Sequence, residues 1–190
     1  MWLINQNDDR LLQLQVDHLF FNWRRRAAEY PRFPNVIDSF AASLAKFLDF
    51  VRLEELGDFT PLSCELSYVN HMPKGQGWQE PRDFANILRD FCWQSDSTRF
   101  LPDPVACGWQ AHFPLPGSLG RLMARLNQVT RKEDQMPLLV LELSAKGIGD
   151  DKTPAGLLAW FDVAHEWIVR GFADLTTMSA QKDLWGRIDA

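Results

Sequence analysis

The chain has 190 residues, a formal net charge of −5 and a hydrophobic fraction of 46%. That length suits one domain, and that hydrophobic fraction is too high for a disordered protein. Basic residues number 20 and acidic residues 25, so the chain lacks the basic surplus that supplies the affinity of most sequence-independent nucleic-acid binders. Nucleic acid is therefore disfavoured as a partner.

Targeting and redox signals are absent from the sequence. No apolar run approaches the roughly 18–20 residues that a membrane-spanning helix needs. The start, Met1–Gln6, has neither the basic nor the apolar region of a signal peptide. Cys64, Cys92 and Cys107 form no CxxC pair, which excludes a zinc knuckle or a redox motif. We expect reduced thiols in a cytoplasmic protein that does not enter a membrane.

The first predicted element is a strand within residues 12–23, where apolar and polar side chains alternate. Its apolar positions are Leu12, Leu14, Val16, Leu19, Phe21 and Trp23. The phase of the alternation shifts between Val16 and Leu19. A bulge, or a strand buried on both faces, would explain this shift.

A long helix follows two prolines, Pro31 and Pro34. Proline lacks an amide hydrogen and fixes φ, so we expect the helix to begin after Pro34. Asn35 is the predicted N-cap, Asp38 lies in the first turn, and Gly57 is the predicted stop. Apolar residues recur between them at helical spacing.

The remaining elements alternate between strands and helices. The sequence predicts a strand over 62–68, a loop over 73–77 and a shorter helix that begins at Pro81. Three strands follow over 105–113, 121–129 and 138–144, and their short connections imply antiparallel neighbours. The last long helix has Thr153 as N-cap and Pro154 at its first position, and one or two helical turns are expected near 180–188.

This order favours an α+β fold. We expect a single domain over residues 1–190, with a mainly antiparallel sheet of about five strands and helices packed on one face. The strands alternate apolar and polar residues, which is typical of a sheet with one solvated face. If the face opposite the helices is open, Glu65, Ser67 and Asn70 on one strand and Gln13, Gln15 and Asp17 on another would make a polar, concave surface that could bind a ligand or partner. An ordinary solvated sheet face is the alternative.

No catalytic or metal-binding motif is present. The histidines have no metal-ligand spacing, and adjacent His165 and Glu166 point about 100° apart on a helix. A partly buried, hydrogen-bonded histidine is the simpler interpretation of His165. Asp150 and Asp151 follow two glycines but lack the lysine of a phosphate-binding loop, and neighbouring loop aspartates are usually just solvated. We therefore expect no metal, no cofactor and no catalytic residue.

Three motifs resemble one family. They are Asn22-Trp23-Arg24 with Tyr30-Pro31-Arg32, then Tyr68-Val69-Asn70, and finally His165 with Phe172, Leu175-Thr176 and Trp185. They resemble the NWR…YPR, YVN and H…F…LT…W motifs of a sporadically distributed bacterial family of unknown function. The resemblance extends over nearly the whole chain. It implies no established activity.

The resemblance adds two expectations. Members of that family usually carry a further N-terminal segment rich in strands, so the resemblance implies that this chain is the C-terminal part of a longer member. If strands are missing, an open sheet edge remains, which invites a protein partner or self-association. Patchy distribution implies an accessory role of antitoxin, immunity or defence type.

The candidate binding residues come from the polar members of these motifs and their neighbours, which lack an obvious packing task. They are Asn22, Arg24, Arg25, Arg32, Glu65, Asn70 and His165. Our first hypothesis is a non-enzymatic binding or protein-interaction module, supported by the missing catalytic motifs and the eight tryptophans. The alternatives are an enzyme with an Arg/Asn/Glu pocket and, less favoured, a nucleic-acid binder that uses Arg24–Arg26. These residues also have a purely structural interpretation. In it, each Asn at a strand end satisfies backbone groups, and each Arg pairs with an Asp or a Glu.

Overall fold

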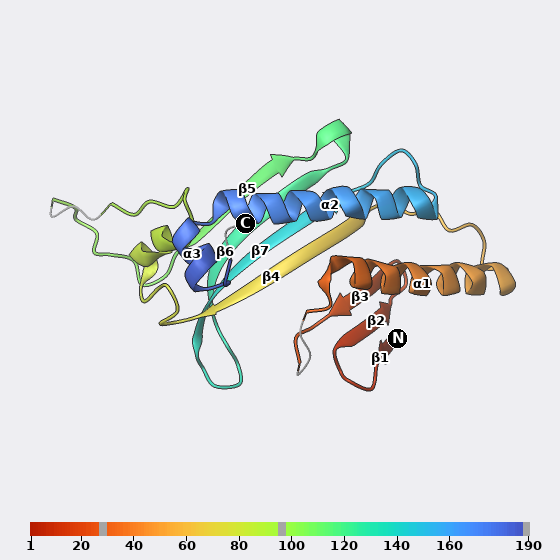
Figure 1. The fold of residues 1–190 in the computed structure, drawn as a ribbon, viewed down its shortest axis with the longest axis horizontal. Coiled ribbons are helices and arrows are strands. Elements are labelled where there is room, and N and C mark those ends of the chain that lie inside the picture. Colours follow the sequence, from red (N-terminus) through yellow and green to blue (C-terminus); the bar gives the residue numbers. More distant parts are fainter. Residues whose placement is uncertain (27–29, 95–97, 188–190) are drawn as a thin grey trace. The chain divides into compact units, whose positions relative to one another are not determined.

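The computed structural model describes residues 1–26, 30–94 and 98–187, and these form two compact units. The first unit comprises residues 1–62 and 151–158, and the second comprises residues 63–150 and 159–190. Antiparallel strands occur together with helices (Figure 1), so the α+β class is confirmed. The expected single sheet of about five strands is not confirmed, because the described strands form one sheet of three and another of four. One domain over residues 1–190 stays a prediction.

The sheet of the first unit is built from three short strands. They are β1 (Trp2–Ile4), β2 (Arg10–Leu14) and β3 (Leu19–Trp23), which pair antiparallel in the order β1-β2-β3. The predicted bulge is wrong. The shift in apolar phase is a hairpin turn, in which the Gln15 amide donates to the His18 carbonyl oxygen at 2.9 Å and Val16 is fully exposed. Each strand is therefore shorter than the alternation suggested.

Helix α1 (Arg32–Leu53) begins earlier than predicted. Pro34 lies inside its first turn, which is tolerated because amides of the first turn have no partner within the helix. Asn35 is not the N-cap, and its side-chain amide instead donates to the Pro31 carbonyl oxygen at 2.6 Å. Phe33 and Leu44 are buried on the inner face of the helix.

The end of α1 is a Schellman motif that does not use the predicted glycine. The Leu56 amide donates to the Val51 carbonyl oxygen at 3.0 Å, and the Glu55 amide donates to that of Arg52 at 3.3 Å. Glu55 adopts the left-handed conformation with φ 50°. Gly57 lies beyond this motif, with φ 97°. The predicted stop at Gly57 is therefore displaced by two residues.

The sheet of the second unit has four strands. They are β4 (Cys64–Pro73), β5 (Gly108–Pro114), β6 (Arg121–Thr130) and β7 (Pro137–Gly147). The order is β4-β7-β6-β5, and every neighbouring pair is antiparallel. The predicted antiparallel succession of the last three strands is confirmed. The two edges of this sheet are β4 and β5.

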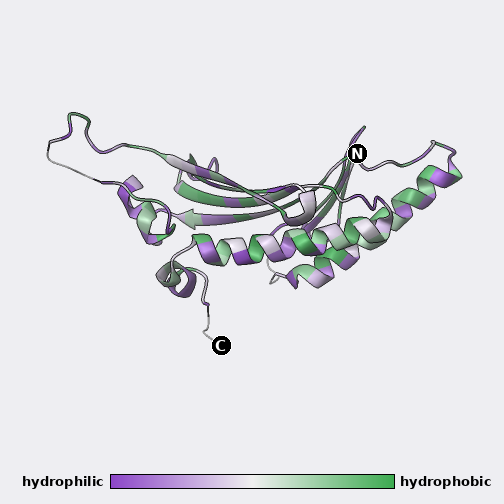
Figure 2. Cartoon of the chain, turned by 90° about the horizontal axis from the view of Figure 1, so that it is seen from above, coloured by the Kyte–Doolittle hydropathy of each residue, from purple (hydrophilic) through white to green (hydrophobic). Residues whose placement is uncertain are grey.

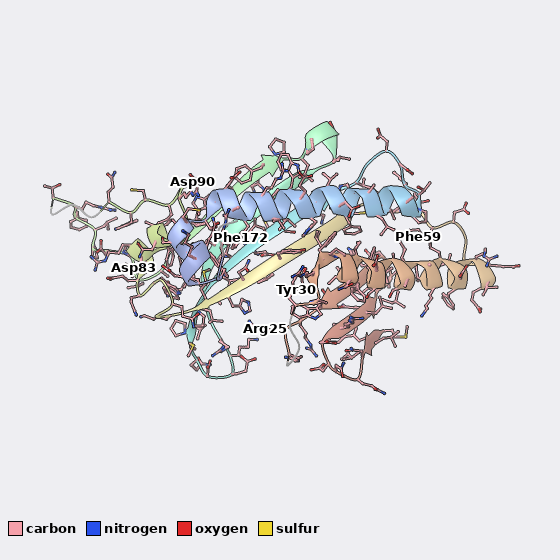
Figure 3. The ribbon with its side chains drawn as sticks, viewed as in Figure 1. Arg25, Tyr30, Phe59, Asp83, Asp90 and Phe172 are labelled. Carbon is pink, nitrogen blue, oxygen red and sulfur yellow. The ribbon has the colours of Figure 1, made fainter. Side chains whose placement is uncertain are left out.

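The second unit also contains three short helices. They are η1 (Pro81–Asn86), η2 (Pro116–Ser118) and α3 (Met178–Asp183). The helix predicted at Pro81 is a 3₁₀-helix whose first turn is closed by Asp83 (Figure 3), which accepts the amides of Gln79 and Glu80. It ends at Asn86 and does not continue as an α-helix, because Leu88 forms a β-bridge with Thr176.

Helix α2 (Pro154–Leu175) begins as predicted. The Gly156 amide donates to Thr153 Oγ1 at 3.2 Å, so Thr153 is the N-cap and Pro154 the first helical residue. Figure 2 shows α2 along one face of the four-stranded sheet. The approach is close at Gly171, where an added Cβ would lie 3.0 Å from Leu122 Cδ2. The side chains buried between helix and sheet include Leu122, Ala124, Leu126, Leu139, Leu141, Leu143, Trp160, Ala164 and Ile168.

Candidate functional site

The structure divides the candidate residues between the two units. Asn22, Arg24, Arg25 and Arg32 belong to the first unit, and Glu65, Asn70 and His165 belong to the second. An enzyme pocket that combines residues of both groups stays a prediction. Each group is therefore considered within its own unit.

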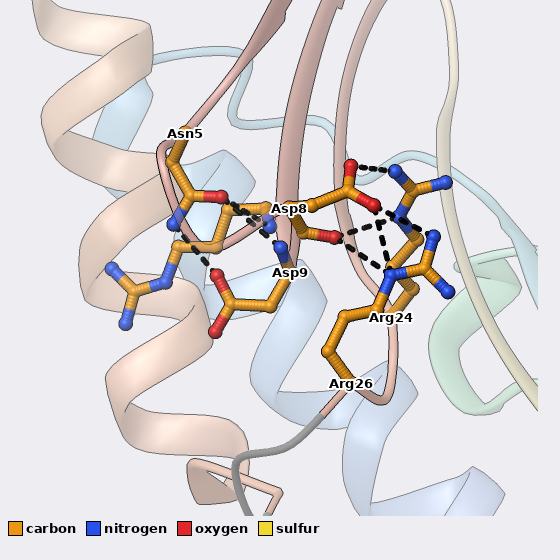
Figure 4. A network of polar contacts seen from close by, with 6 residues as sticks. Asn5, Asp8, Asp9, Arg24 and Arg26 are labelled. Atoms are coloured by element: carbon orange, nitrogen blue, oxygen red, sulfur yellow. Dashed lines mark hydrogen bonds and ion pairs between the residues drawn. The ribbon is translucent and has the colours of Figure 1, made fainter.

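Arg24 belongs to a cluster at the turn between β1 and β2 (Figure 4). Its Nε donates to the Asp8 carbonyl oxygen at 2.9 Å, and its guanidinium pairs with the Asp8 carboxylate. Arg26 Nε donates to the same carboxylate at 2.9 Å. The hydrogen bonds from Arg26 and Arg24 hold the pKa of Asp8 below its ordinary value. Two of the three consecutive arginines are thus committed to one aspartate.

The same turn is fixed by Asn5 and Asp9. The Asn5 side chain accepts the amides of Asp9 and Arg10 at 3.1 and 3.0 Å, and donates to the Asp9 carboxylate at 2.6 Å. The Arg24 amide in turn donates to the Asp9 carbonyl oxygen at 2.9 Å. This cluster closes the β1–β2 hairpin, and it favours the structural interpretation of Arg24. The polar run after Ile4 is a turn signal that could have revealed it.

The other candidates of the first unit remain exposed. Asn22 lies on β3 opposite Leu11. Arg25, labelled in Figure 3, follows β3 and makes no hydrogen bond or ion pair within residues 1–26, 30–94 and 98–187. Arg32 is the first residue of α1 and has φ 62°. The structure brings none of these three into a shared cluster.

Glu65 and Asn70 lie on opposite faces of the four-stranded sheet. Successive side chains of a strand alternate between faces, so Asn70 shares its face with Tyr68 and Glu65 does not. The Tyr68 hydroxyl shares a hydrogen bond of 2.8 Å with His165 Nδ1 on α2, which identifies the face of Asn70 as the helix-covered one. A polar surface that holds both Glu65 and Asn70 is therefore wrong.

His165 is a partly buried histidine, as its simpler interpretation predicted. Burial lowers its pKa, while the nearby carboxylate of Asp162 opposes the shift. Its hydrogen bond to Tyr68 ties α2 to β4. This geometry explains His165 by packing between helix and sheet.

The face that points away from α2 carries polar side chains among apolar ones, the latter being Val69, Met123, Val129, Leu138 and Val140. Strand alternation places on it the side chains of Glu65, Ser67, His71, Gln110, His112, Arg121, Arg125, Asn127, Glu142, Ser144 and Lys146. The Lys146 ammonium lies 3.5 Å from Glu65 Oε2, and Ser144 Oγ donates to Glu65 Oε1 at 3.2 Å. Arg125 and Glu142 form an ion pair of 2.7 Å across β6 and β7. The charged groups on this face are thus largely paired with one another.

The outer edge of β4 carries unpaired main-chain groups. Among the described strands, β4 pairs with β7 alone. The Lys74 amide donates to the Pro137 carbonyl oxygen at 3.0 Å in the same register, so even-numbered residues of β4 direct their amide and carbonyl groups to β7. Odd-numbered residues therefore direct theirs outward. These are Glu65, Ser67, Val69 and His71, followed by Pro73, which has no amide hydrogen.

Two further absences hold for the part of the chain that the structure describes. It contains no group of three or more His, Cys, Asp or Glu residues that could hold a metal ion. It also contains no helix both long and apolar enough to cross a membrane.

Asp151, which follows the two loop glycines, accepts the Thr153 amide at 2.9 Å and so supports the start of α2. Burial raises the pKa of the Cys64 thiol to about 11.

Comparison with known proteins leaves the chain without a relative to argue from. No protein-family model matches it, and no curated protein or solved structure is significantly similar to it. The family resemblance of the three motifs stays a prediction. Any function must be inferred from the geometry of the chain's own residues.

Proposed function

We propose that this chain is a non-enzymatic protein-interaction module that binds an extended segment of polypeptide along the outer edge of β4. One observation carries the proposal, namely the outward main-chain groups of Glu65, Ser67, Val69 and His71 on a strand with one described neighbour. The proposal retains a bacterial, cytoplasmic protein with an accessory role of antitoxin, immunity or defence type, as the family resemblance implies.

An unpaired edge suits this role because an added strand satisfies its donors and acceptors together. Four outward amides and four outward carbonyl groups accept one antiparallel segment. Each hydrogen bond contributes a net stabilisation of about 0.5–1.5 kcal/mol, so eight contribute about 4–12 kcal/mol, which is of the same order as the cost of association. The side chains of these residues are exposed beside the added strand and would supply specificity.

The other edge of the sheet is a weaker candidate. β5 is seven residues long, whereas β4 has ten. The Leu115 amide donates to the Gly120 carbonyl oxygen, so even-numbered residues of β5 point outward, and the last of these, Pro114, has no amide hydrogen. Gln110 is the central outward residue of β5, which makes it a matched control for Val69 on β4.

Selection of binding peptides from a displayed random library tests the proposal. The native chain, Val69→Pro and Gln110→Pro are each immobilised after their folding is checked by circular dichroism. Proline removes one outward amide in either variant without touching a hydrogen bond inside the sheet. We expect peptides that bind the native chain and Gln110→Pro, and that lose affinity for Val69→Pro. Binding that survives Val69→Pro, or a monomeric chain that selects no peptide, would contradict the proposal.

A further inference from the structure

We infer that the segment bound at the outer edge of β4 is the β4 strand of a second copy of this chain, paired antiparallel about a two-fold axis at Tyr68. The inference rests on the proposed function and names its partner. It follows from the direction of the main-chain groups, the length of the edge and the charges at its two ends.

The direction of the main-chain groups limits where this axis can lie. Only odd-numbered residues direct main-chain groups outward, so odd residues must face odd residues across the new interface. An axis at Tyr68 sets Glu65 against the partner's His71 and Ser67 against the partner's Val69. Each outward amide between Glu65 and His71 then finds a carbonyl oxygen on the other copy. No outward donor of this stretch is left without an acceptor.

The neighbouring registers differ in what meets at their ends. Moving the axis to Val69 sets Glu65 against the partner's Pro73, which can accept a hydrogen bond but has no amide hydrogen to donate, and this register permits as many main-chain hydrogen bonds as the axis at Tyr68. Moving it to Ser67 sets His71 against the partner's Ser63, which lies before the start of β4 at Cys64. Only the axis at Tyr68 sets the Glu65 carboxylate against the imidazole of the partner's His71, and this pairing distinguishes it from the axis at Val69.

The polar side chains at the two ends of the edge are complementary in that register. A carboxylate at one end of β4, Glu65, faces an imidazole at the other end, the partner's His71, and the two-fold axis repeats the pair. Both side chains are exposed on the open face. Their charged neighbour on the adjacent strand is Lys146, 3.5 Å from Glu65 Oε2, and Ser144 donates to the other oxygen. An imidazole N–H can donate a hydrogen bond to a carboxylate, whereas like charges on facing residues destabilise antiparallel pairs.

The resulting assembly is an eight-stranded antiparallel sheet built from two four-stranded sheets. Facing residues of antiparallel strands lie on the same face, so α2 of both copies covers one face and the polar side chains of both copies share the other. On the helix-covered face, Leu66 lies opposite the partner's Asn70, and Tyr68 lies opposite the partner's Tyr68. The interface is isologous, as closed dimers require.

Analytical ultracentrifugation of the full chain measures the association directly. We expect the native chain and Gln110→Pro to form a species of twice the 21.9 kDa chain mass. Val69→Pro should remain monomeric, because each copy loses an outward donor at the centre of the interface. Gln110→Pro carries the same type of substitution at the other edge of the sheet, so it controls for any general effect of proline.

A charge series tests the register without altering the backbone. His71→Glu places two carboxylates against each other, and Glu65→Lys places an ammonium against the imidazole. Each variant alone should associate about tenfold more weakly than the native chain. An equimolar mixture of the two should regain native association as a heterodimer, because a carboxylate then faces an imidazole in one pair and an ammonium in the other. This series stays decisive if Val69→Pro does not fold.

Several outcomes would overturn the inference. They are a monomeric native chain, a dimer that persists in folded Val69→Pro, or a mixture of the charge variants that associates no better than each alone. A monomeric native chain that still selects peptides at β4 would refute the second copy and leave the proposed function standing. A monomer that selects no peptide would refute both.

Discussion

Substitution of Gly147 by alanine tests how tightly the end of β7 packs against the turn that precedes β6. A Cβ at this position would lie 2.0 Å from the Leu119 carbonyl oxygen and 2.6 Å from Gly120 Cα. Ordinary van der Waals separation is about 3.5 Å, so backbone atoms must move by about an ångström or more. The displaced carbonyl also accepts Trp160 Nε1 at 2.9 Å. Overpacking costs about 1–3 kcal/mol and a strained hydrogen bond about 1 kcal/mol, so we expect a loss of about 2–4 kcal/mol.

Urea unfolding followed by tryptophan fluorescence measures this loss. With an m-value of about 2 kcal/mol/M, the midpoint should fall by about 1–2 M. Gly149→Ala is the matched control, because its Cβ would meet the flexible end of Leu119 at 3.3 Å instead of backbone. A midpoint for Gly147→Ala within about 0.25 M of the native value, or an equal loss in Gly149→Ala, would refute the packing argument.

Three further predictions concern pH and the end of α1. Because burial lowers the folded pKa of His165, the unfolded chain takes up the proton first, and the free energy of unfolding should fall as pH drops below about 6.5; an NMR titration that places this pKa at or above about 6.5 would contradict the burial argument. Since Arg26 and Arg24 lower the pKa of Asp8, the pKa of Asp8 should rise toward its ordinary value in Arg26→Ala. An NMR titration of the Asp8 carboxyl group measures this, and an unchanged pKa would disprove the pairing. Glu55→Gly removes a left-handed non-glycine residue and should stabilise the chain by about 0.5–1 kcal/mol in urea unfolding; a loss of stability would refute the Schellman assignment.

Elements whose signals are local could be predicted from the sequence. The alternation over 62–68 predicted β4, and Cys64, Leu66 and Tyr68 share one face in the structure. The predicted start at Leu62 is wrong, because β4 begins at Cys64 and Leu62 lies exposed before it. The cap and first residue of α2, Thr153 and Pro154, were also predicted, because hydroxyl capping and the fixed φ of proline act within a single turn.

Features that depend on pairing between distant segments could not be predicted. The alternating segment over 12–23 was predicted as one strand, but the Gln15–His18 turn divides it into two. The turn forms because β2 and β3 pair with each other, and such pairing does not show in the alternation. The 3₁₀-helix at Pro81 ends early because Leu88 pairs with Thr176, far along the chain. Alternation likewise assigns the face of a residue and does not reveal which strand lies at the edge of a sheet. The outward groups of Val69 therefore became visible only in the structure.

The central claim is that the outer edge of β4 is open in the single chain and covered in the complex. Amide hydrogen exchange, resolved by NMR across a dilution series, measures this residue by residue. We predict slow exchange at Leu66, Tyr68 and Asn70 at every concentration, because these amides bond to β7. Ser67 and Val69 should exchange quickly in dilute solution and slowly once the chain associates. Slow exchange at Ser67 and Val69 at all concentrations, or fast exchange at all concentrations with association established, would contradict the account.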